Sequence, residues 1–222
     1  MSDTERHSRA LDAELITDPD LKAKKEVSNG LKQFDAVAEQ VEYWSHPERP
    51  FKLRLSAILG LQRIALEGIT ALAGTFRPAG IEISGSRHKP AGAHLVPELV
   101  EQMCDYVNTN WGKKSPIHLC AYVLWRLNWI HPFVDGNGRT ARAVSYLVLC
   151  VGMGYRLPGT KTIPELIADD KTPYYRALEV ADEGVEKTGE PDLSAMEVLL
   201  EGLLARQLVE VLHKAKGDRT RV

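Results

Sequence analysis

Cysteine is scarce in this sequence, and two common metal- and nucleotide-binding motifs are missing from it. The three cysteines, Cys104, Cys120 and Cys150, are scattered, and none forms a C-x-x-C pair. Neither a disulfide framework nor a cysteine-based zinc site is therefore expected, and a reducing cytoplasm fits best. The sequence contains neither H-E-x-x-H nor G-x-x-x-x-G-K-(S/T), which excludes the zinc metalloproteases and P-loop enzymes that these motifs identify.

Long apolar runs and a strong net charge are also absent. The longest apolar stretch, 143–151, is interrupted by Ser145 and is shorter than the roughly 20 residues that span a bilayer. The first ten residues, MSDTERHSRA, lack the apolar segment of a secretory signal. The net charge of −2 at pH 7 gives no bulk attraction for nucleic acid or acidic lipid. We therefore expect a cytoplasmic protein with no nucleic-acid or membrane partner.

The composition is that of an ordinary globular protein, and the apolar pattern is mainly helical. Apolar residues make up 44% of the 222 residues and charged residues 26%, so the chain can build a core without a metal or a disulfide. Prolines and glycines divide the helical pattern. The predicted helices are 21–44, with a weak point at Asn29-Gly30; 51–72; one that begins at Pro97; 116–130; one that follows Gly138; 163–168; 174–181; and 193–212.

Residues 81–97 depart from this helical pattern. Apolar and polar residues alternate over 81–84, and Gly85-Ser86 then forms a turn. This pattern predicts a short β-hairpin, which would form a flap on a protein that is otherwise helical. The fold class expected from the residues is an all-α bundle with a short β-hairpin flap.

The segment His131–Arg142, HPFVDGNGRTAR, joins two helices that are apolar nearly all round and so belong at the centre of the bundle. Gly136 and Gly138 let the backbone turn tightly beside a ligand. The next helix begins there, so its free N–H groups and the positive end of its dipole face the turn. Arg139 and Arg142 lie three residues apart in the first helical turn. This arrangement is typical of a polyphosphate site.

Two other side chains add chemistry to this phosphate site. Asp135 places a carboxylate beside the expected anion, which makes sense if Mg²⁺ lies between them. His131 is the one side chain of the segment that can take up a proton near pH 7. The residues by themselves thus predict a site for a nucleotide, a metal ion and a general base.

This segment resembles the motif of the Fic family, H-P-F-x-(D/E)-G-N-G-R-x-x-R, and every specified position matches. Residues 73–77, AGTFR, resemble the family's A-G-x-x-R segment, and residues 81–97 resemble the flap that aligns the backbone of a target protein. The likeness extends over roughly 51–181. Most members of the family transfer AMP from ATP to a hydroxyl group of a protein.

The resemblance implies a role for each residue of the motif. His131 would be the catalytic base that acts on the target hydroxyl, and Phe133 would anchor the loop in the core. Asp135 would bind an Mg²⁺ ion that bridges the α- and β-phosphates. The implied nucleotide-binding residues are Gly136, Asn137 and Gly138 in an anion hole, with Arg139 and Arg142 on the outer phosphates.

The resemblance also implies a Fic-like helical bundle in three parts. These are an N-terminal helical arm over 1–50, a catalytic core over 51–185, and a C-terminal helix with a basic tail over 186–222. The implied function is that of a protein adenylyltransferase, which moves AMP from ATP to a Ser, Thr or Tyr hydroxyl of a target protein. The related Doc-type kinases carry Ala and Lys at the positions of Gly136 and Gly138, so these glycines favour attack at the α-phosphate.

Other functions on the same scaffold stay open, and so does regulation. The alternatives are another nucleotidyl or phosphoryl transfer, removal of AMP, and a regulatory module that only binds nucleotide. Many Fic proteins carry an inhibitory helix with (S/T)-x-x-x-E-(G/N), whose Glu pairs with the second Arg of the motif. Glu26, Glu67 and Glu201 match this pattern in part, but each lacks the Ser or Thr. Autoinhibition, a separate antitoxin protein and the absence of such control are therefore alternatives.

Three residues outside the motif have two interpretations each. His88, in the flap, could contact a target or the nucleotide, although a solvated loop histidine is the simpler interpretation. Tyr174 and Tyr175 could stack on adenine, although aromatic residues at helical spacing more often belong to the core. The sequence identifies neither the target protein nor the nucleotide base.

Overall fold

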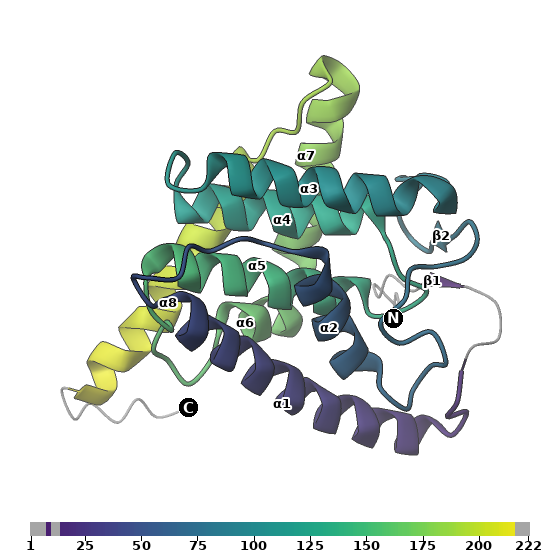
Figure 1. Ribbon diagram of the computed structural model, residues 1–222, viewed down its shortest axis with the longest axis horizontal. Helices are drawn as coiled ribbons and strands as arrows, with labels where there is room; N and C mark the ends of the chain where they lie inside the picture. The colour runs from purple at the N-terminus through teal and green to yellow at the C-terminus, as the bar shows by residue number, and fades with distance from the viewer. Residues whose placement is uncertain (1–7, 10–13, 216–222) are drawn as a thin grey trace.

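The structure is a computed structural model that describes residues 8–9 and 14–215. The described part is almost entirely helical, as Figure 1 shows, and this confirms the predicted all-α class. The helices are α1 (Pro19–Trp44), α2 (Leu55–Leu66), α3 (Val96–Asn110), α4 (Pro116–Ile130), α5 (Asn137–Met153), α6 (Ile163–Asp169), α7 (Thr172–Thr188) and α8 (Ser194–Ala215), with a short 3₁₀ turn, η1 (Ala93–Leu95), before α3.

Helices α4 and α5 form the centre of the bundle. They pack against each other along their length; α3 and α8 also cover α4, and α1 and α2 also cover α5. Leu124 of α4 and Val144 and Leu149 of α5 are fully buried. The expectation that two helices apolar on every face flank the His131–Arg142 segment at the bundle centre is confirmed. Because both helices are enclosed, the loop between them is held at a fixed place.

The start of α4 follows from its capping residues. The hydroxyl of Ser115 accepts a hydrogen bond from the backbone N–H of His118 at 3.0 Å, and Pro116 occupies the first turn, where its missing N–H costs little. The predicted bounds of this helix, 116–130, are confirmed. The last helix continues to Ala215 rather than ending near 212, and the basic tail expected beyond residue 215 lies outside the described residues.

Several predicted helix boundaries are wrong, and α7, for example, continues to Thr188 rather than ending at 181. The break expected at Asn29-Gly30 does not occur, because α1 is continuous from Pro19 to Trp44. The buried side chain of Asn29 instead donates hydrogen bonds to the backbone oxygens of Ala65 (3.2 Å) and Glu67 (2.9 Å), which joins α1 to the end of α2. Helix α2 covers 55–66 instead of 51–72, because the backbone becomes extended at Glu67 (ψ 122°).

The flap is a single strand rather than the predicted hairpin. Strand β2 (Glu82–Ile83) pairs antiparallel with strand β1 (Ser8–Arg9), so that Ser8 lies opposite Ile83. After β2 the chain turns back at 83–86, but in the described residues it forms no returning strand. The N-terminal segment thus supplies the strand partner that the sequence pattern assigned to the flap itself.

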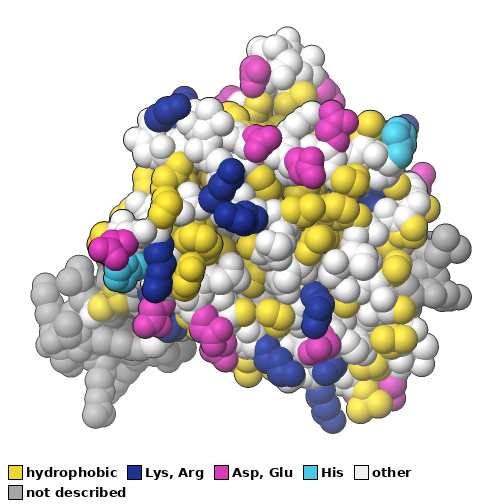
Figure 2. Space-filling view, viewed as in Figure 1, with side chains coloured by type: hydrophobic (Ala, Val, Ile, Leu, Met, Phe, Trp, Pro, Cys, Tyr) yellow, Lys and Arg dark blue, Asp and Glu magenta, His cyan; other side chains and the backbone are white. Residues whose placement is uncertain are grey.

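The surface agrees with the small net charge. Figure 2 shows acidic and basic side chains mixed over the face that it draws, with no broad patch of one sign. Among residues 14–215, no helix is long and apolar enough to cross a membrane.

Candidate functional site

The loop between α4 and α5 has two backbone positions in the left-handed region. His131 has a φ of 51°, and no other non-glycine residue of the described chain has a positive φ. Gly136, which precedes α5, has a φ of 78°, and a Cβ atom there would overlap the side chain of Leu66. A glycine at 136 is therefore required both by the backbone conformation and by the close approach of α2.

Asn137 holds the loop in shape through its side chain. Its amide oxygen accepts from the N–H of Phe133 at 2.9 Å, and its amide nitrogen donates to the carbonyl of Phe133 at 2.8 Å. The ring of Phe133 is buried against Phe76, with 5.9 Å between ring centroids. Buried Gln62 adds a hydrogen bond from Nε2 to the carbonyl of Asp135 at 3.2 Å. The side chain of Asn137 is thus used within the protein, and only its backbone N–H, at the start of α5, could face an anion.

His131 is placed as a neutral base. Its Nδ1 lies 3.3 Å from the carbonyl oxygen of Asn128. A carbonyl only accepts, so Nδ1 carries the proton and Nε2 carries the lone pair. Nε2 is buried and has no hydrogen-bond partner in the structure. The pKa of His131 is lowered to about 4, mainly by burial and in part by the nearby positive charge of Arg77. At neutral pH the Nε2 lone pair is therefore available to accept a proton.

His131, Gly138 and Arg142 line one cavity. Ile83, Ser86 and His88 of the flap also line this cavity. The other walls come from α4 (Asn128 and Trp129) and α7 (Tyr174, Tyr175, Leu178 and Asp182). The structure thus brings the first turn of α5, the flap and α7 together around the predicted base.

The two arginines of the motif have different surroundings. Arg142 lines the cavity beside Tyr174 and Tyr175, and burial lowers the pKa of its guanidinium. Arg139 does not line this cavity; it pairs with Glu26 of α1 at 3.2 Å and with Asp135 at 3.3 Å. Only Arg142 therefore lies in the cavity with His131.

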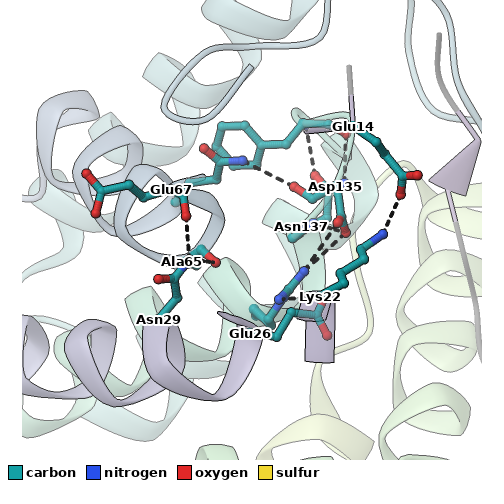
Figure 3. Close-up of polar contacts among 12 residues, drawn as sticks. Glu14, Lys22, Glu26, Asn29, Ala65, Glu67, Asp135 and Asn137 are labelled. Atoms are coloured by element: carbon teal, nitrogen blue, oxygen red, sulfur yellow. Dashed lines mark hydrogen bonds and ion pairs between the residues drawn. The ribbon is translucent and has the colours of Figure 1, made fainter. Parts of the chain in front are cut away.

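Glu26 and Asp135 belong to a charged cluster on the side of α1, shown in Figure 3. Lys22, one turn before Glu26, pairs with Glu14. The hydrogen bond to Glu14 raises the pKa of Lys22, and the charges of Asp135 and Glu26 add to this effect. The N-terminal half of α1 thus carries charges of both signs next to the first turn of α5.

The glutamates considered as inhibitory residues do not pair as expected. Glu26 pairs with Arg139 instead of Arg142. The side chains of Glu67 and Glu201 are exposed, and no ion pair joins either of them to Arg142 in the described part of the chain. Glu26 is thus the one of the three that contacts the motif, and it does so through the first arginine.

Asp135 is suited to a metal ion that arrives with a nucleotide. Its side chain is 42% exposed, and its Oδ1 accepts from the N–H of Gly136 at 2.5 Å. Within residues 14–215 no group of three or more His, Cys, Asp or Glu side chains could hold a metal ion by itself. Mg²⁺ usually takes one or two carboxylates together with phosphate oxygens and water. One accessible carboxylate beside the first turn of α5 fits that ligand set.

Some residues of the cavity were misread or missed in the sequence. The interpretation of His88 as a solvated loop histidine is wrong, because its Nε2 lies 2.7 Å from the carbonyl oxygen of Trp129 and its ring packs on that indole. Tyr174 is buried, accepts from Asn128 Nδ2 at 2.6 Å and also lines the cavity. It is therefore both a core residue and a site residue.

Asp182 was not identified from the sequence, although a signal is present there. It accepts a hydrogen bond from Trp125 Nε1 at 2.8 Å and lines the cavity. Tyr174, Leu178 and Asp182 are spaced four residues apart, which places them on one face of α7. A carboxylate at the end of an apolar stripe on that face is the pattern that could have indicated a site residue.

Comparisons with known proteins agree with the motif. A family model described as the Fic/DOC family matches residues 52–149. A Fido domain-containing protein of Dictyostelium discoideum is 30% identical over 128 residues, which is 55% of this chain and 80% of that protein. A protein named Protein adenylyltransferase Fic from Drosophila willistoni is 30% identical over 135 residues, which is 60% of this chain. The chain spans 25% of the length of that Drosophila relative.

A solved structure has the same architecture. A Fic domain containing signaling protein from Bacteroides thetaiotaomicron superposes with a TM-score of 0.74 at 23% sequence identity, over 93% of this chain and 78% of that one. At this level of identity the likeness concerns the fold, and it confirms that the helical bundle is Fic-like.

Proposed function

This chain belongs to the Fic/DOC family, and we propose that it is a protein adenylyltransferase, which transfers AMP from ATP to a Ser, Thr or Tyr hydroxyl of a target protein. The observation that carries the proposal is the cavity that a neutral His131 shares with Gly138 and Arg142 at the start of α5. The name of the Drosophila relatives, protein adenylyltransferase, supports this reaction over the other transfers.

In this proposal the phosphates of ATP bind at the first turn of α5. The N–H groups of that turn have no intrahelical partner, and they lie at the positive end of the helix dipole. Gly138 leaves the backbone uncovered on the cavity side, and Arg142 supplies a charged donor. The nucleoside extends toward α7, where the rings of Tyr174 and Tyr175 offer an apolar wall and Asp182 offers a carboxylate.

The chemical step needs a proton acceptor, which His131 provides. The target hydroxyl gives its proton to Nε2 of His131 as its oxygen bonds to the α-phosphorus. The bond between the α-phosphorus and the oxygen bridging to the β-phosphate breaks, and pyrophosphate leaves. Mg²⁺, held by Asp135 and the phosphate oxygens, would supply positive charge to the leaving pyrophosphate. The hydrogen bond from Nδ1 to Asn128 keeps the imidazole in the tautomer that this step requires.

The target is proposed to dock along β2, because an exposed strand edge can pair with an extended segment of another protein. Residue Ile83 of β2 lines the cavity, so a segment paired there lies close to His131. Strand β1 pairs with the same strand in this chain. A target that uses that edge must therefore displace residues 8–9.

The test is incubation of the protein with a cell lysate and with ATP labelled at either the α- or the γ-phosphate, with His131→Ala as the control. We expect protein labelling from the α-label alone, and none with the variant. Labelling from the γ-label alone would indicate a kinase. Binding of ATP without transfer to any protein would favour a regulatory module that only binds nucleotide.

A further inference from the structure

The C-terminal end of α4 receives its hydrogen bonds from residues that precede it by more than 40 positions. The last carbonyl groups of a helix have no intrahelical partner and carry the negative end of the helix dipole. Here Arg77 Nε donates to the carbonyl of His131 at 2.8 Å, and Arg77 Nη2 lies 3.5 Å from the carbonyl of Ile130. His88 Nε2 lies 2.7 Å from the carbonyl of Trp129. The end of the helix that carries the base is therefore capped by the flap and by the residue just before it.

The same guanidinium also binds the backbone just before the flap and within it. Arg77 Nη1 donates to the carbonyl of Ala79 at 2.9 Å, and Nη2 donates to the carbonyl of Ala91. In addition, the backbone N–H of Arg77 donates to the carbonyl of Pro132 at 2.9 Å. One side chain thus connects two points of the chain, just before the flap at Ala79 and within it at Ala91, to the backbone of the motif.

Arg77 is unusual because it is a buried charged residue that makes these connections through backbone carbonyls alone. Its side chain is 2% exposed, and no ion pair involves it in the described part of the chain. Burial lowers the pKa of its guanidinium. A buried charge without a carboxylate partner is costly unless its donors are satisfied. A guanidinium has five donors on three nitrogens of a rigid, planar fork and can reach carbonyls that lie apart, whereas a lysine has three donors on one nitrogen and an amide has two.

The carbonyl that Arg77 Nε holds belongs to the one described non-glycine residue in the left-handed region, His131. That backbone conformation is uncommon for a non-glycine residue and persists only where the surroundings fix it. We propose that Arg77 is a positioning residue that fixes the flap and His131 in one geometry, and that it thereby sets the rate of AMP transfer without contacting the nucleotide. This inference rests on the proposed function for its kinetic consequence, but its geometric consequence can be measured independently.

The proposal predicts a split between chemistry and binding. Displacing a reacting group by about 1 Å can cost 10²-fold in rate. Loss of Arg77 should therefore lower the kcat of AMP transfer by roughly 10²-fold. The affinity for ATP should change by less than about threefold, because the N–H groups of α5 and the guanidinium of Arg142 remain in place.

The experiment compares Arg77→Met and Arg77→Lys with the wild type, and Arg87→Met serves as the matched control because Arg87 is an exposed arginine of the same flap. Amide hydrogen exchange is measured over 79–91 and 131–135, ATP affinity by calorimetry, and kcat and KM with α-labelled ATP. In Arg77→Met we expect faster exchange in both segments together and a reduced kcat. We expect partial recovery of both in Arg77→Lys, and no change in Arg87→Met.

Several results would overturn the proposal. Exchange that rises in only one of the two segments would mean that Arg77 does not join them. An equal loss of ATP affinity and of kcat would make it a nucleotide-binding or merely structural residue. If Arg77→Met does not fold, the graded effect of Arg77→Lys on exchange and on kcat decides the question. If the wild type transfers no AMP, the proposed function fails, and the exchange data alone still decide whether Arg77 joins the flap to the loop.

Discussion

The two arginines at the start of α5 are three residues apart, yet they lie in two different kinds of surroundings. Arg142 lines a cavity with His131 and two tyrosines, and it is largely shielded from water. Arg139 lies in a partly exposed cluster with Glu26 and Asp135, where carboxylates already satisfy its charge. The comparison teaches that two arginines of one motif can differ in their surroundings: Arg142 lies beside a cavity, and Arg139 is already paired with a carboxylate of α1.

The largest effect is expected on the cavity side, from removal of the base. His131→Ala should lower AMP transfer by about 10²–10⁴-fold, the usual contribution of a positioned general base. ATP affinity should barely change, because the glycine turn and both arginines remain. Calorimetric titration of ATP beside a transfer assay measures the two effects. If this variant transfers AMP at the wild-type rate, His131 is not the base, and most of the proposed mechanism is wrong.

The two arginines themselves give the direct test of the comparison. A charge-assisted hydrogen bond contributes about 1.5–3 kcal/mol, so Arg142→Ala should weaken ATP binding by roughly 10- to 150-fold. Arg139→Ala should weaken it less, because in the wild type Arg139 must first leave Glu26 and Asp135 to meet a phosphate. Equal losses of affinity in the two variants would show that the ion pairs of Arg139 make no difference.

The pKa of His131 should show that the cavity around its ring is shielded from water, unlike the partly exposed cluster around Arg139. Burial lowers this pKa to about 4 from an ordinary value near 6.5. His131 should therefore stay neutral down to about pH 5 and become protonated only as the pH falls through 4, which removes the base. NMR titration of the imidazole, assigned by comparison with His131→Gln, measures this directly. A midpoint near 6.5 would mean that water reaches the ring in solution.

The lowered pKa of His131 should also make the stability of the protein depend on pH. Between pH 6.5 and 4 the unfolded chain binds a proton at His131 that the native chain does not, so the free energy of unfolding should decrease as the pH falls through this range. The His131→Gln variant should lose this part of the pH dependence. Urea unfolding of both proteins at pH 7 and pH 5 gives the comparison, and parallel losses in the two would contradict it.

The smallest effect is expected from the contact between α1 and Arg139. Partly exposed ion pairs contribute about 0.2–1 kcal/mol, so Glu26→Gln should raise ATP affinity by no more than roughly fivefold as Arg139 becomes free for a phosphate. Glu67→Gln and Glu201→Gln are matched controls, because both carboxylates are exposed and neither pairs with an arginine of the motif. If Glu26→Gln leaves ATP binding and transfer at wild-type levels, then α1 does not restrain this arginine.

Much of the site could be predicted from the sequence because its determinants are local. The helix 116–130 follows from a serine cap, a proline in the first turn and an apolar run, all of which act within a few residues. Gly136, Asn137 and Gly138 shape a turn whose contacts are with the loop itself, as the two hydrogen bonds between Asn137 and Phe133 illustrate. The motif thus predicted that His131, Gly138 and Arg142 lie close together at the start of α5, and all three line one cavity.

The tertiary structure decided the contacts between distant parts of the chain. The Glu26–Arg139 pair, the capping of α4 by Arg77 and His88, and the pairing of β2 with residues 8–9 each join segments more than 40 residues apart. No local pattern encodes them, because each depends on how the helices pack. For the same reason the expected hairpin and the break at Asn29 were wrong: a strand edge and a buried amide take whichever partner packing brings to them, here β1 and the end of α2.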